Sequence, residues 1–221
     1  AEDNPFLGQR GIRLTLCLEE LFQTQLRALL RAGHSHNLKI MFPMVSNLNE
    51  LQQALVHLQA AREALEARGR AYAKDVEVGI MVEVPSAALI ASVLAQHVDF
   101  FSIGTNDLAQ YTMAAARTNA SVASLANPFH PAVLHLIEMT IAAAHEQGRW
   151  VGLCGEFAGN PLAAPLLLGL GLDEFSMSPR AIPVVKEALR RLSSEDARDI
   201  ARHALTLPDA DTVEAYLKSV Q

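Results

Sequence analysis

Apolar positions recur along the chain in two alternating patterns, one typical of helices and one of buried strands. The first helical pattern covers residues 14–32, where apolar side chains recur every three or four residues and Gly33 follows as a candidate cap. A short apolar run at 38–45 predicts a strand. Asn47 and Glu50 follow it with the spacing of a helix-capping pair, ahead of a long helical stretch. The chain therefore begins as helix, strand, helix.

The same strand-then-helix unit recurs through the rest of the sequence. Further strands are predicted at 76–84, 99–107, 150–157 and 174–178. Further helices are predicted at 86–96, between Pro131 and Gly148, and at 181–192, 194–205 and 210–219. The strands are apolar along most of their length, which is typical of parallel strands covered on both faces. We therefore expect a parallel α/β sheet.

Polar residues at the strand ends favour a barrel over a doubly wound sheet. They are Glu83, Asn106, Asp107, Cys154 and Glu156. In a (β/α) barrel the C-terminal ends of the strands converge on one mouth, where active sites are built. We therefore predict a TIM-type (β/α) barrel. Only about five of its eight strands are recognisable, so residues 1–221 are expected to form one barrel domain that lacks its first three strands.

Composition narrows the class of protein further. Half of the 221 residues are hydrophobic and 19% are charged, enough for one sizeable core. The net charge of -6 disfavours nucleic acid as a partner, and no apolar run reaches the roughly 18 residues of a membrane span, so no membrane insertion is expected. The two cysteines, Cys17 and Cys154, suggest no disulfide framework and favour a reducing, cytoplasmic setting.

Two strand-end carboxylates are candidate metal ligands. Glu83 and Asp107 end successive strands, and hard oxygen ligands suit Mg²⁺ or Mn²⁺ bridging to a phosphate. The alternative is that each carboxylate caps the following helix or pairs with a basic residue. Gly104 and Thr105, just before Asn106, allow a backbone to approach an anion closely. On this pattern alone, both interpretations stay open.

Two arginines and one cysteine complete the candidate chemistry. The planar guanidinium groups of Arg10 and Arg117 are suited to clamping a small polyanion, although a single arginine is more often solvated. Cys154, flanked by Gly152 and Gly155, would lie at the barrel mouth, where a thiol can donate a proton to an enolate. The alternative is an inert cysteine of the core.

Six sequence blocks in order identify a resemblance that covers nearly the whole chain. They are NPFLGQRGIR, IMFPMV, GIMVEVPSAA, VDFFSIGTNDLAQYT, GLCGEFAGNP and GLGLDEFSMS. Together they resemble the phosphoenolpyruvate-utilising enzymes, and most closely enzyme I of the bacterial sugar phosphotransferase system. In that family a barrel domain binds phosphoenolpyruvate with Mg²⁺. The phosphoryl group passes to a histidine on a separate swivelling domain and then to the carrier protein HPr, and pyruvate is released.

The resemblance implies a role for each candidate residue. Glu83 and Asp107 become metal ligands, and Asp107 and Asn106 also become contacts to the substrate. Arg10 and Arg117 become clamps for its phosphate and carboxylate groups. The resemblance also implies that the protein is a homodimer formed through this domain.

The resemblance further makes Cys154 the acid that protonates the enolate to pyruvate. Two positions depart from the family pattern. Gln9 stands where the family usually has Trp, and Ala116 stands where it usually has an acidic residue, so a change in the orientation of the arginine clamps or in substrate affinity is expected. The phosphohistidine domain, the HPr-docking helices and the first barrel strands have no counterpart in this sequence, so the chain alone is not expected to complete the reaction.

Two alternatives to enzyme I stay open. Pyruvate phosphate dikinase and phosphoenolpyruvate synthase share the barrel but belong to much longer chains. The segments DLAQYT and GLCGEFAGN favour enzyme I over these enzymes. A non-catalytic module that senses phosphoenolpyruvate or forms a dimer is the third interpretation, against which the intact candidate ligands argue.

Overall fold

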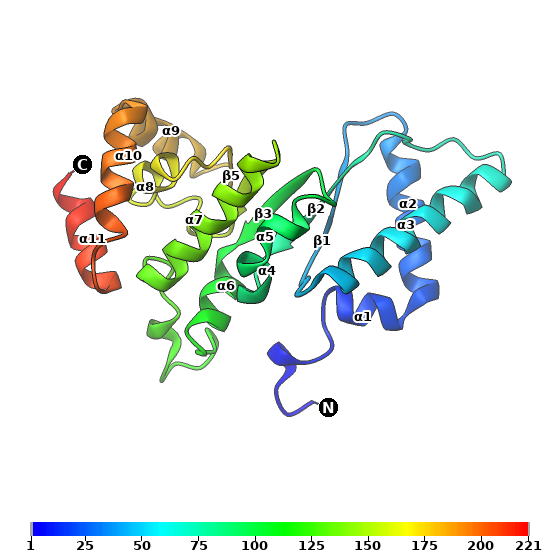
Figure 1. Cartoon of the computed structure of the whole chain (residues 1–221), viewed down its shortest axis with the longest axis horizontal. Helices are drawn as coiled ribbons and strands as arrows, with labels where there is room; N and C mark the ends of the chain where they lie inside the picture. The colour runs from blue at the N-terminus through cyan, green and yellow to red at the C-terminus, as the bar shows by residue number, and fades with distance from the viewer. Residues whose placement is uncertain (1, 221) are drawn as a thin grey trace.

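The computed structural model describes residues 2–220, which form a parallel sheet with helices between successive strands (Figure 1). The strands are β1 (Lys39–Phe42), β2 (Glu77–Val82), β3 (Phe100–Gly104), β4 (Trp150–Cys154) and β5 (Glu174–Ser176). The α-helices are α1 (Ile12–Cys17), α2 (Glu19–Gly33), α3 (Leu48–Ala67), α4 (Pro85–Leu89), α5 (Ala91–Leu94), α6 (Thr105–Thr112), α7 (Pro131–Glu146), α8 (Ala164–Gly169), α9 (Ile182–Arg190), α10 (Ser194–Ala204) and α11 (Ala210–Ser219). Two short 3₁₀ turns are η1 (Pro5–Leu7) and η2 (Ala123–Leu125).

The order of the strands identifies the architecture. Neighbours in the sheet follow one another in the sequence, β1-β2-β3-β4-β5, and every pair is parallel. A doubly wound sheet reverses its strand order at a switch point, whereas a (β/α) barrel does not. The predicted barrel architecture is therefore confirmed. Within residues 2–220, β1 and β5 each pair on one side only, so the barrel is open and incomplete, as predicted.

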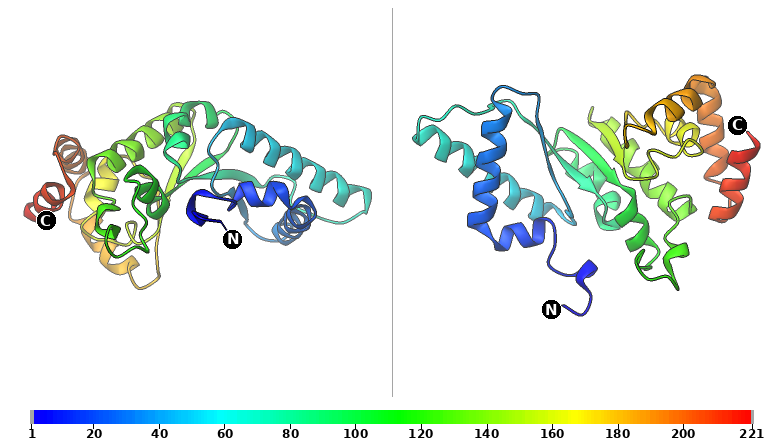
Figure 2. Two further views of the ribbon diagram at one scale, coloured as in Figure 1. Left: turned by 90° about the horizontal axis from the view of Figure 1, so that it is seen from below. Right: turned by 180° about the vertical axis from the view of Figure 1, so that it is seen from behind.

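The two faces of the sheet differ in burial. Ile80, Phe101 and Val151 lie in register on the face that packs against helices, and all three are fully buried. Met81 and Ser102 pair on the other face and are only partly buried. The sequence analysis predicted strands that are covered on both faces. The second face, which would be the interior of a closed barrel, is only partly covered within residues 2–220. Figure 2 shows the elements as an arch, with the N-terminal segment on its hollow side.

A cluster of large side chains fills the interior face near the beginning of the strands. The rings of Phe100 and Trp150 stack with 4.5 Å between their centroids, and Lys39 lies over the Trp150 ring. The indole N–H of Trp150 donates to Glu77, which also pairs with Lys39. Gly79 gives the Phe100 ring its space, because a Cβ there would lie 2.6 Å from ring carbons. This layer closes the end of the interior away from the strand tips.

Two predicted helices are interrupted. The helix expected over 14–32 is two helices, α1 and α2, because Leu18 between them has a non-helical ψ of 61°. The helix expected over 86–96 is divided in the same way at Ile90. Gly33 is the last residue of α2 rather than its cap, and it does not adopt a positive φ. That detail of the prediction is wrong.

Other predicted helix ends are confirmed. The side chain of Asn47 accepts the backbone N–H of Glu50, and the Glu50 carboxylate in turn accepts the N–H of Ser46. Gly148 lies just after α7 with a φ of 66°, the left-handed conformation of a terminating glycine. The three C-terminal helices begin and end within two residues of the predicted positions. Local sequence therefore specifies most of these boundaries.

The N-terminal segment is held against the end of β1. The backbone N–H of Ile12 donates to the carbonyl of Pro43, and Gly11 adopts a φ of 54°. A Cβ on Gly11 would lie 2.6 Å from the Cβ of Met44, so only glycine fits this close approach. The segment is thereby anchored with Arg10 at the strand tips.

Candidate functional site

The predicted site residues come from three successive strand ends and the N-terminal segment. Glu83 follows β2, Asp107 lies in the first turn of α6 after β3, and Cys154 ends β4. The carboxyl ends of parallel strands meet at one edge of the sheet. Arg10 reaches the same edge from the N-terminal segment, where it contacts Asp107.

Glu83 is a buried carboxyl group with an elevated pKa. Its side chain is 4% exposed, and its Oε1 accepts the backbone N–H of Met44 at 2.7 Å. Burial raises the pKa to about 7, a rise that the Met44 N–H opposes and the negative charge of Asp107 increases. Gly104 leaves room for this carboxylate, since a Cβ there would lie 3.0 Å from the Cβ of Glu83. The positive charge near Glu83 is therefore too small to offset the effect of burial on its pKa.

Arg10 binds the carboxylate of Asp107 with both terminal nitrogens. Nη2 lies 3.3 Å from Oδ2, and Nη1 lies 3.4 Å from Oδ1. Nη1 also donates to the hydroxyl of Tyr111 at 3.0 Å, and that hydroxyl donates to the carbonyl of Phe6. The guanidinium carbon lies 5.6 Å from the Phe6 ring centre. Arg10 is thus held from several sides, with Asp107 at its tip.

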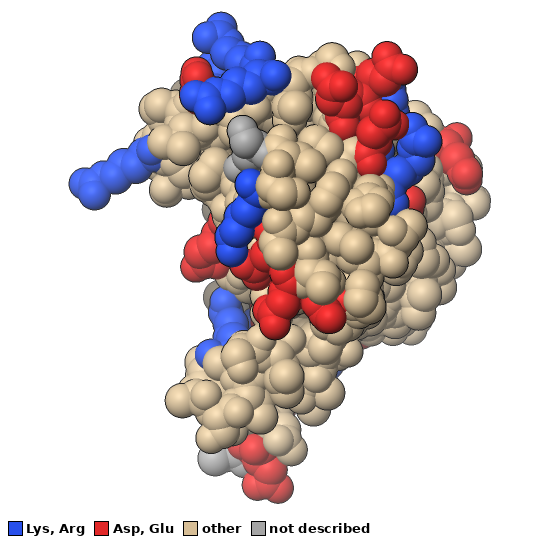
Figure 3. Space-filling view, turned by 90° about the vertical axis from the view of Figure 1, so that its left-hand side faces the viewer, with Lys and Arg blue, Asp and Glu red and all other residues tan. Residues whose placement is uncertain are grey.

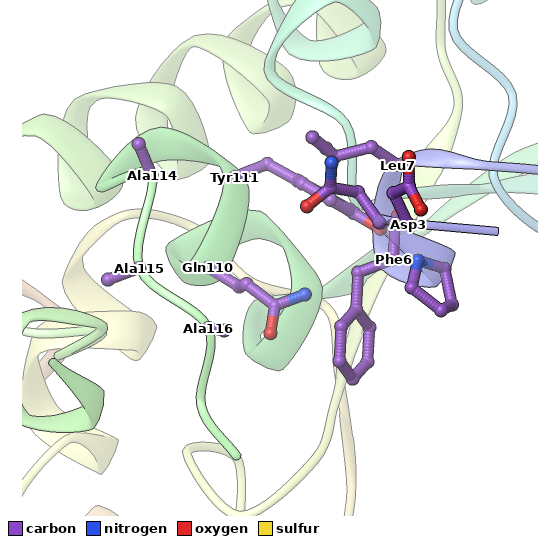
Figure 4. A pocket seen from close by; sticks show the side chains of 10 residues that line it. Asp3, Phe6, Leu7, Gln110, Tyr111, Ala114, Ala115 and Ala116 are labelled. Carbon is purple, nitrogen blue, oxygen red and sulfur yellow. Dashed lines mark hydrogen bonds between the residues drawn. The ribbon is translucent and has the colours of Figure 1, made fainter. Parts of the chain in front are cut away.

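A cavity of about 400 Å³ opens beside this arrangement. Figure 4 shows the side chain of Tyr111 reaching toward the N-terminal segment, with the Phe6 ring and the Gln110 amide on the same side. The segment Ala114–Ala116 lines the opposite side of the cavity. Because Ala116 stands where an acidic residue was expected, this wall of the cavity carries no charge.

Gln110 connects two of the predicted site residues. Its side chain is 4% exposed, and its amide nitrogen donates to Oδ1 of Asp107 at 3.4 Å. Its amide oxygen accepts the backbone N–H of Arg117 at 3.1 Å. The buried amide of Gln110 therefore helps to position both the Asp107 carboxylate at the start of α6 and the backbone of Arg117 in the loop that follows this helix.

Asn106, Glu156 and Arg117 occupy the outer part of the strand tips. The amide nitrogen of Asn106 donates to Oε2 of Glu156 at 2.8 Å. This hydrogen bond lowers the pKa of Glu156, and the positive charge of Arg117 lowers it further. Arg117 is an exposed residue. A cavity of about 470 Å³ lies next to them, lined also by Gly155 and Ser176 at the ends of β4 and β5.

Cys154 is half-buried at the tip of β4. Its Sγ lies 3.6 Å from the carbonyl oxygen of Ile103, in the geometry of a weak hydrogen bond. Burial raises the pKa of the thiol, a hydrogen bond with Ser102 opposes the rise, and the charge of Glu83 increases it. The thiol therefore stays protonated at neutral pH and is available as a proton donor rather than a nucleophile.

The carboxylates of Glu83 and Asp107 fit a hard divalent cation. The two groups are close enough to share a hydrogen bond and to raise the pKa of Glu83. Among residues 2–220 no group of three or more His, Cys, Asp or Glu side chains is arranged to hold a metal. Two carboxylates agree with Mg²⁺, which is commonly bound by one or two carboxylates together with substrate phosphates and water.

Sequence reasoning did not single out four residues that support the site. They are Phe6, Met44, Gln110 and Tyr111. For Gln110 and Tyr111 a signal was available, because positions three and four residues after Asp107 lie on the same face of a helix. Met44 acts through its backbone N–H and Phe6 through its carbonyl as well as its ring, and backbone groups carry no sequence signal.

Comparison with known proteins identifies the family. Residues 1–194 match the family described as PEP-utilising enzyme, PEP-binding domain. The phosphoenolpyruvate-protein phosphotransferase of Geobacillus stearothermophilus is 54% identical over 217 residues, and that of Bacillus subtilis (strain 168) is 52% identical over 217 residues. Each match covers 98% of this chain and 38% of the relative. The chain belongs to the PEP-utilising enzymes and spans less than half the length of these curated relatives.

A solved structure supports the fold independently. The crystal structure of a citrate lyase from Burkholderia xenovorans LB400 superposes with a TM-score of 0.58, covering 89% of this chain and 66% of that one. At 18% sequence identity the likeness concerns the fold alone. Separately, no helix within residues 2–220 combines the length and apolar character needed to cross a membrane.

Proposed function

We propose that this chain is the PEP-binding part of a phosphoenolpyruvate–protein phosphotransferase of the enzyme I type. The observation that carries the proposal is the pairing of Arg10 with Asp107 next to the buried Glu83, at the tips of parallel strands. Cationic and anionic groups placed together at a strand-tip site suit a phosphorylated carboxylate bound with a divalent cation. The names of the relatives reported above support the same substrate.

Binding and orientation are assigned to the residues at the strand tips. Arg10 and Arg117 would contact the phosphate and carboxylate groups of phosphoenolpyruvate, and Asn106 would contact the substrate through its amide. Glu83 and Asp107 would hold Mg²⁺ or Mn²⁺. Such a cation neutralises phosphate charge when it is bound there. Positioning and charge neutralisation are the main contributions that phosphoryl transfer requires of a protein.

Proton transfer is assigned to Cys154. When the P–O bond of phosphoenolpyruvate breaks, the phosphoryl group passes to a histidine nitrogen and an enolate remains. A protonated thiol at the site can give its proton to the enolate carbon, which yields pyruvate and leaves a thiolate that regains a proton from water. The raised pKa of Cys154 supports this role, because the thiol remains protonated until the enolate forms.

The accepting histidine belongs to another domain in this proposal. Within residues 2–220, no histidine side chain bonds to the side chain of Glu83, Asp107 or Cys154. Residues 1–221 would then be the PEP-binding barrel domain of a longer cytoplasmic enzyme that passes the phosphoryl group on to HPr. The open edges of β1 and β5 support association, either with the first barrel strands or in a homodimer.

The proposal is tested by calorimetric titration of the chain with phosphoenolpyruvate, with and without Mg²⁺. Saturable, Mg²⁺-dependent binding that Asp107→Ala abolishes would support the site as assigned. The same titration is made on a longer chain that supplies the three preceding strands, so that an incomplete barrel is not mistaken for a different function. Absence of binding in that folded, longer chain would contradict the proposal.

A further inference from the structure

A groove lined by four arginines lies between the C-terminal ends of α2 and α3. Arg27 and Arg31 come from α2, and Arg68 and Arg70 come from the segment that follows α3. The groove encloses about 630 Å³, and its other lining residues are uncharged. We call these four residues and the space between them the arginine groove.

The arginine groove lies at the opposite end of the sheet from the candidate site. Helix α2 leads into β1 and helix α3 leads into β2, so both helices end beside the beginnings of strands. The candidate site is built at the strand tips. Figure 1 shows α2 and α3 crossing beside β1, far from the C-terminal helices, and their ends diverge from the crossing point. The groove is therefore separate from the site already described.

The arginines of the groove have no acidic side chain within ion-pair distance in the described part of the chain. Within residues 2–220 none of the four arginines makes an ion pair, and Arg27 donates only to the hydroxyl of Thr24. Arg27 and Arg31 are four residues apart on one helix, a spacing at which like charges are destabilising. An unpaired cationic cluster of this kind on a chain of net charge -6 concentrates positive potential at one place.

The C-terminal helices carry arginines in a different arrangement. Arg191 pairs with Glu187, and Arg202 pairs with Asp199. Figure 3, which faces these helices, shows Lys and Arg side chains interspersed with Asp and Glu side chains over the same face. Mixed charge of this kind is an ordinary solvated surface, and it provides a control region for the arginine groove.

Helix dipoles explain only part of the cluster. The C-terminus of a helix favours cations, which accounts for Arg31 in the last turn of α2 and Arg68 at the end of α3. Arg27 lies before the last turn, and Arg70 lies beyond the end of α3, so neither is placed by this effect. The convergence of all four side chains needs a further reason, which an anionic ligand supplies.

We propose that the arginine groove binds a compact polyanion that carries two or more linked phosphate groups. Guanidinium groups bind phosphate oxygens in pairs, and four of them match a di- or triphosphate. The lining of α2, from Thr24 to Arg31, spans only about 10 Å at the rise of an α-helix, which is too short to track an extended nucleic acid. Among residues 2–220 no aromatic side chain lines the groove, so the phosphate groups rather than a base are recognised.

The experiment is calorimetric titration of the 221-residue chain with inorganic pyrophosphate and with inorganic triphosphate. Saturable binding is expected at about 50 mM NaCl, weakened by at least about tenfold at about 500 mM, because salt screens exposed charges. Arg31→Ala with Arg70→Ala should weaken binding by about tenfold or more. The matched control, Arg190→Ala with Arg198→Ala, should bind as the parent does. The four substituted residues, two in each double variant, are all exposed. Both variants should therefore fold, which circular dichroism checks.

Four outcomes would overturn the proposal, three from these titrations and one from an Arg117→Ala variant. The first is no binding of either anion at low salt by the folded chain, and the second is an equal loss of affinity in the control variant. The third is tighter binding of an acidic peptide than of triphosphate, which would assign the groove to a protein partner. Arg117→Ala separates this proposal from the candidate site: pyrophosphate binding should be unchanged in that variant, and its loss would place the anion at the strand tips instead.

Discussion

Arg10 and Asp107 are 97 residues apart in sequence, yet the guanidinium of one lies against the carboxylate of the other, with 3.3 Å between Nη2 and Oδ2. The N-terminal segment crosses the hollow side of the arch to make this contact possible (Figure 2). The same guanidinium binds the hydroxyl of Tyr111. The contacts among Arg10, Asp107 and Tyr111 therefore depend on how the short N-terminal segment packs against the strand tips.

Replacement of Arg10 by Lys is expected to weaken phosphoenolpyruvate binding by about tenfold. An ammonium group is a point charge, so it cannot keep the contacts to both oxygens of Asp107 and to Tyr111 and still face a substrate. Titration of the longer chain with phosphoenolpyruvate measures the effect. Arg13→Lys is the matched control, because Arg13 pairs with Glu50 rather than with a carboxylate of the candidate site. Equal affinities in the two variants would remove Arg10 from the binding groups.

Glu83→Gln is expected to stabilise the metal-free chain at alkaline pH. The folded-state pKa of Glu83, about 7, lies above its ordinary value of 4.5, so the folded chain binds more protons than the unfolded chain between these values. The free energy of unfolding therefore falls as pH rises from 4.5 through 7, by at most about 3 kcal/mol. Glutamine does not ionise, and its oxygen can still accept the Met44 N–H.

Urea unfolding at pH 5 and pH 8, in the presence of a chelator, measures this difference. The two proteins should be similar at pH 5, and the variant should be the more stable at pH 8. Glu156→Gln is the control, because the pKa of Glu156 is lowered and its carboxylate accepts a hydrogen bond from Asn106. That variant should gain no stability at pH 8. If the stability of the parent protein does not fall between pH 5 and pH 8, the raised pKa of Glu83 is contradicted.

Two substitutions of Gln110 are expected to separate its two contacts. Gln110→Met removes the donor to Asp107 and the acceptor for the Arg117 N–H while keeping the volume of the side chain. Gln110→Glu keeps an acceptor for Arg117 but places a second negative charge beside Asp107. Exchange of the Arg117 amide hydrogen, followed by NMR, should be about tenfold faster in the Met variant and close to the parent in the Glu variant. Equal exchange rates in both variants would show that Gln110 does not hold the Arg117 loop.

Cys154→Ala is expected to slow turnover of the complete enzyme by about a hundredfold or more while the affinity for phosphoenolpyruvate stays the same. The reason is that the thiol acts after the P–O bond breaks, so it adds little to the binding of the ground state. Single-turnover release of pyruvate measures the step. Cys17→Ala removes the other, exposed cysteine and should have no effect. A loss of affinity that matches the loss of rate would make Cys154 a binding group instead.

The side chains at the strand ends could be predicted from the sequence, because they depend only on which residues directly follow each apolar run. Apolar runs followed by Glu83, by Asn106 and Asp107, and by Cys154 predict which side chains stand at the tips of parallel strands. The register confirms the reasoning, since Gly104 and Cys154 pair directly at adjacent tips. The same local reasoning misjudged Gly33, because apolar spacing does not show at which residue a helix stops.

The sequence by itself determined the alternation of strands and helices, the barrel class and the residue types at the strand tips, because hydrophobic periodicity and capping act over a few neighbouring residues. The tertiary structure alone decided that Arg10 faces Asp107, that Gln110 joins Asp107 to the Arg117 loop, and that four arginines from two helix ends share one groove. Such contacts depend on how loops dock and where side chains point, and both follow from packing between segments far apart in the chain.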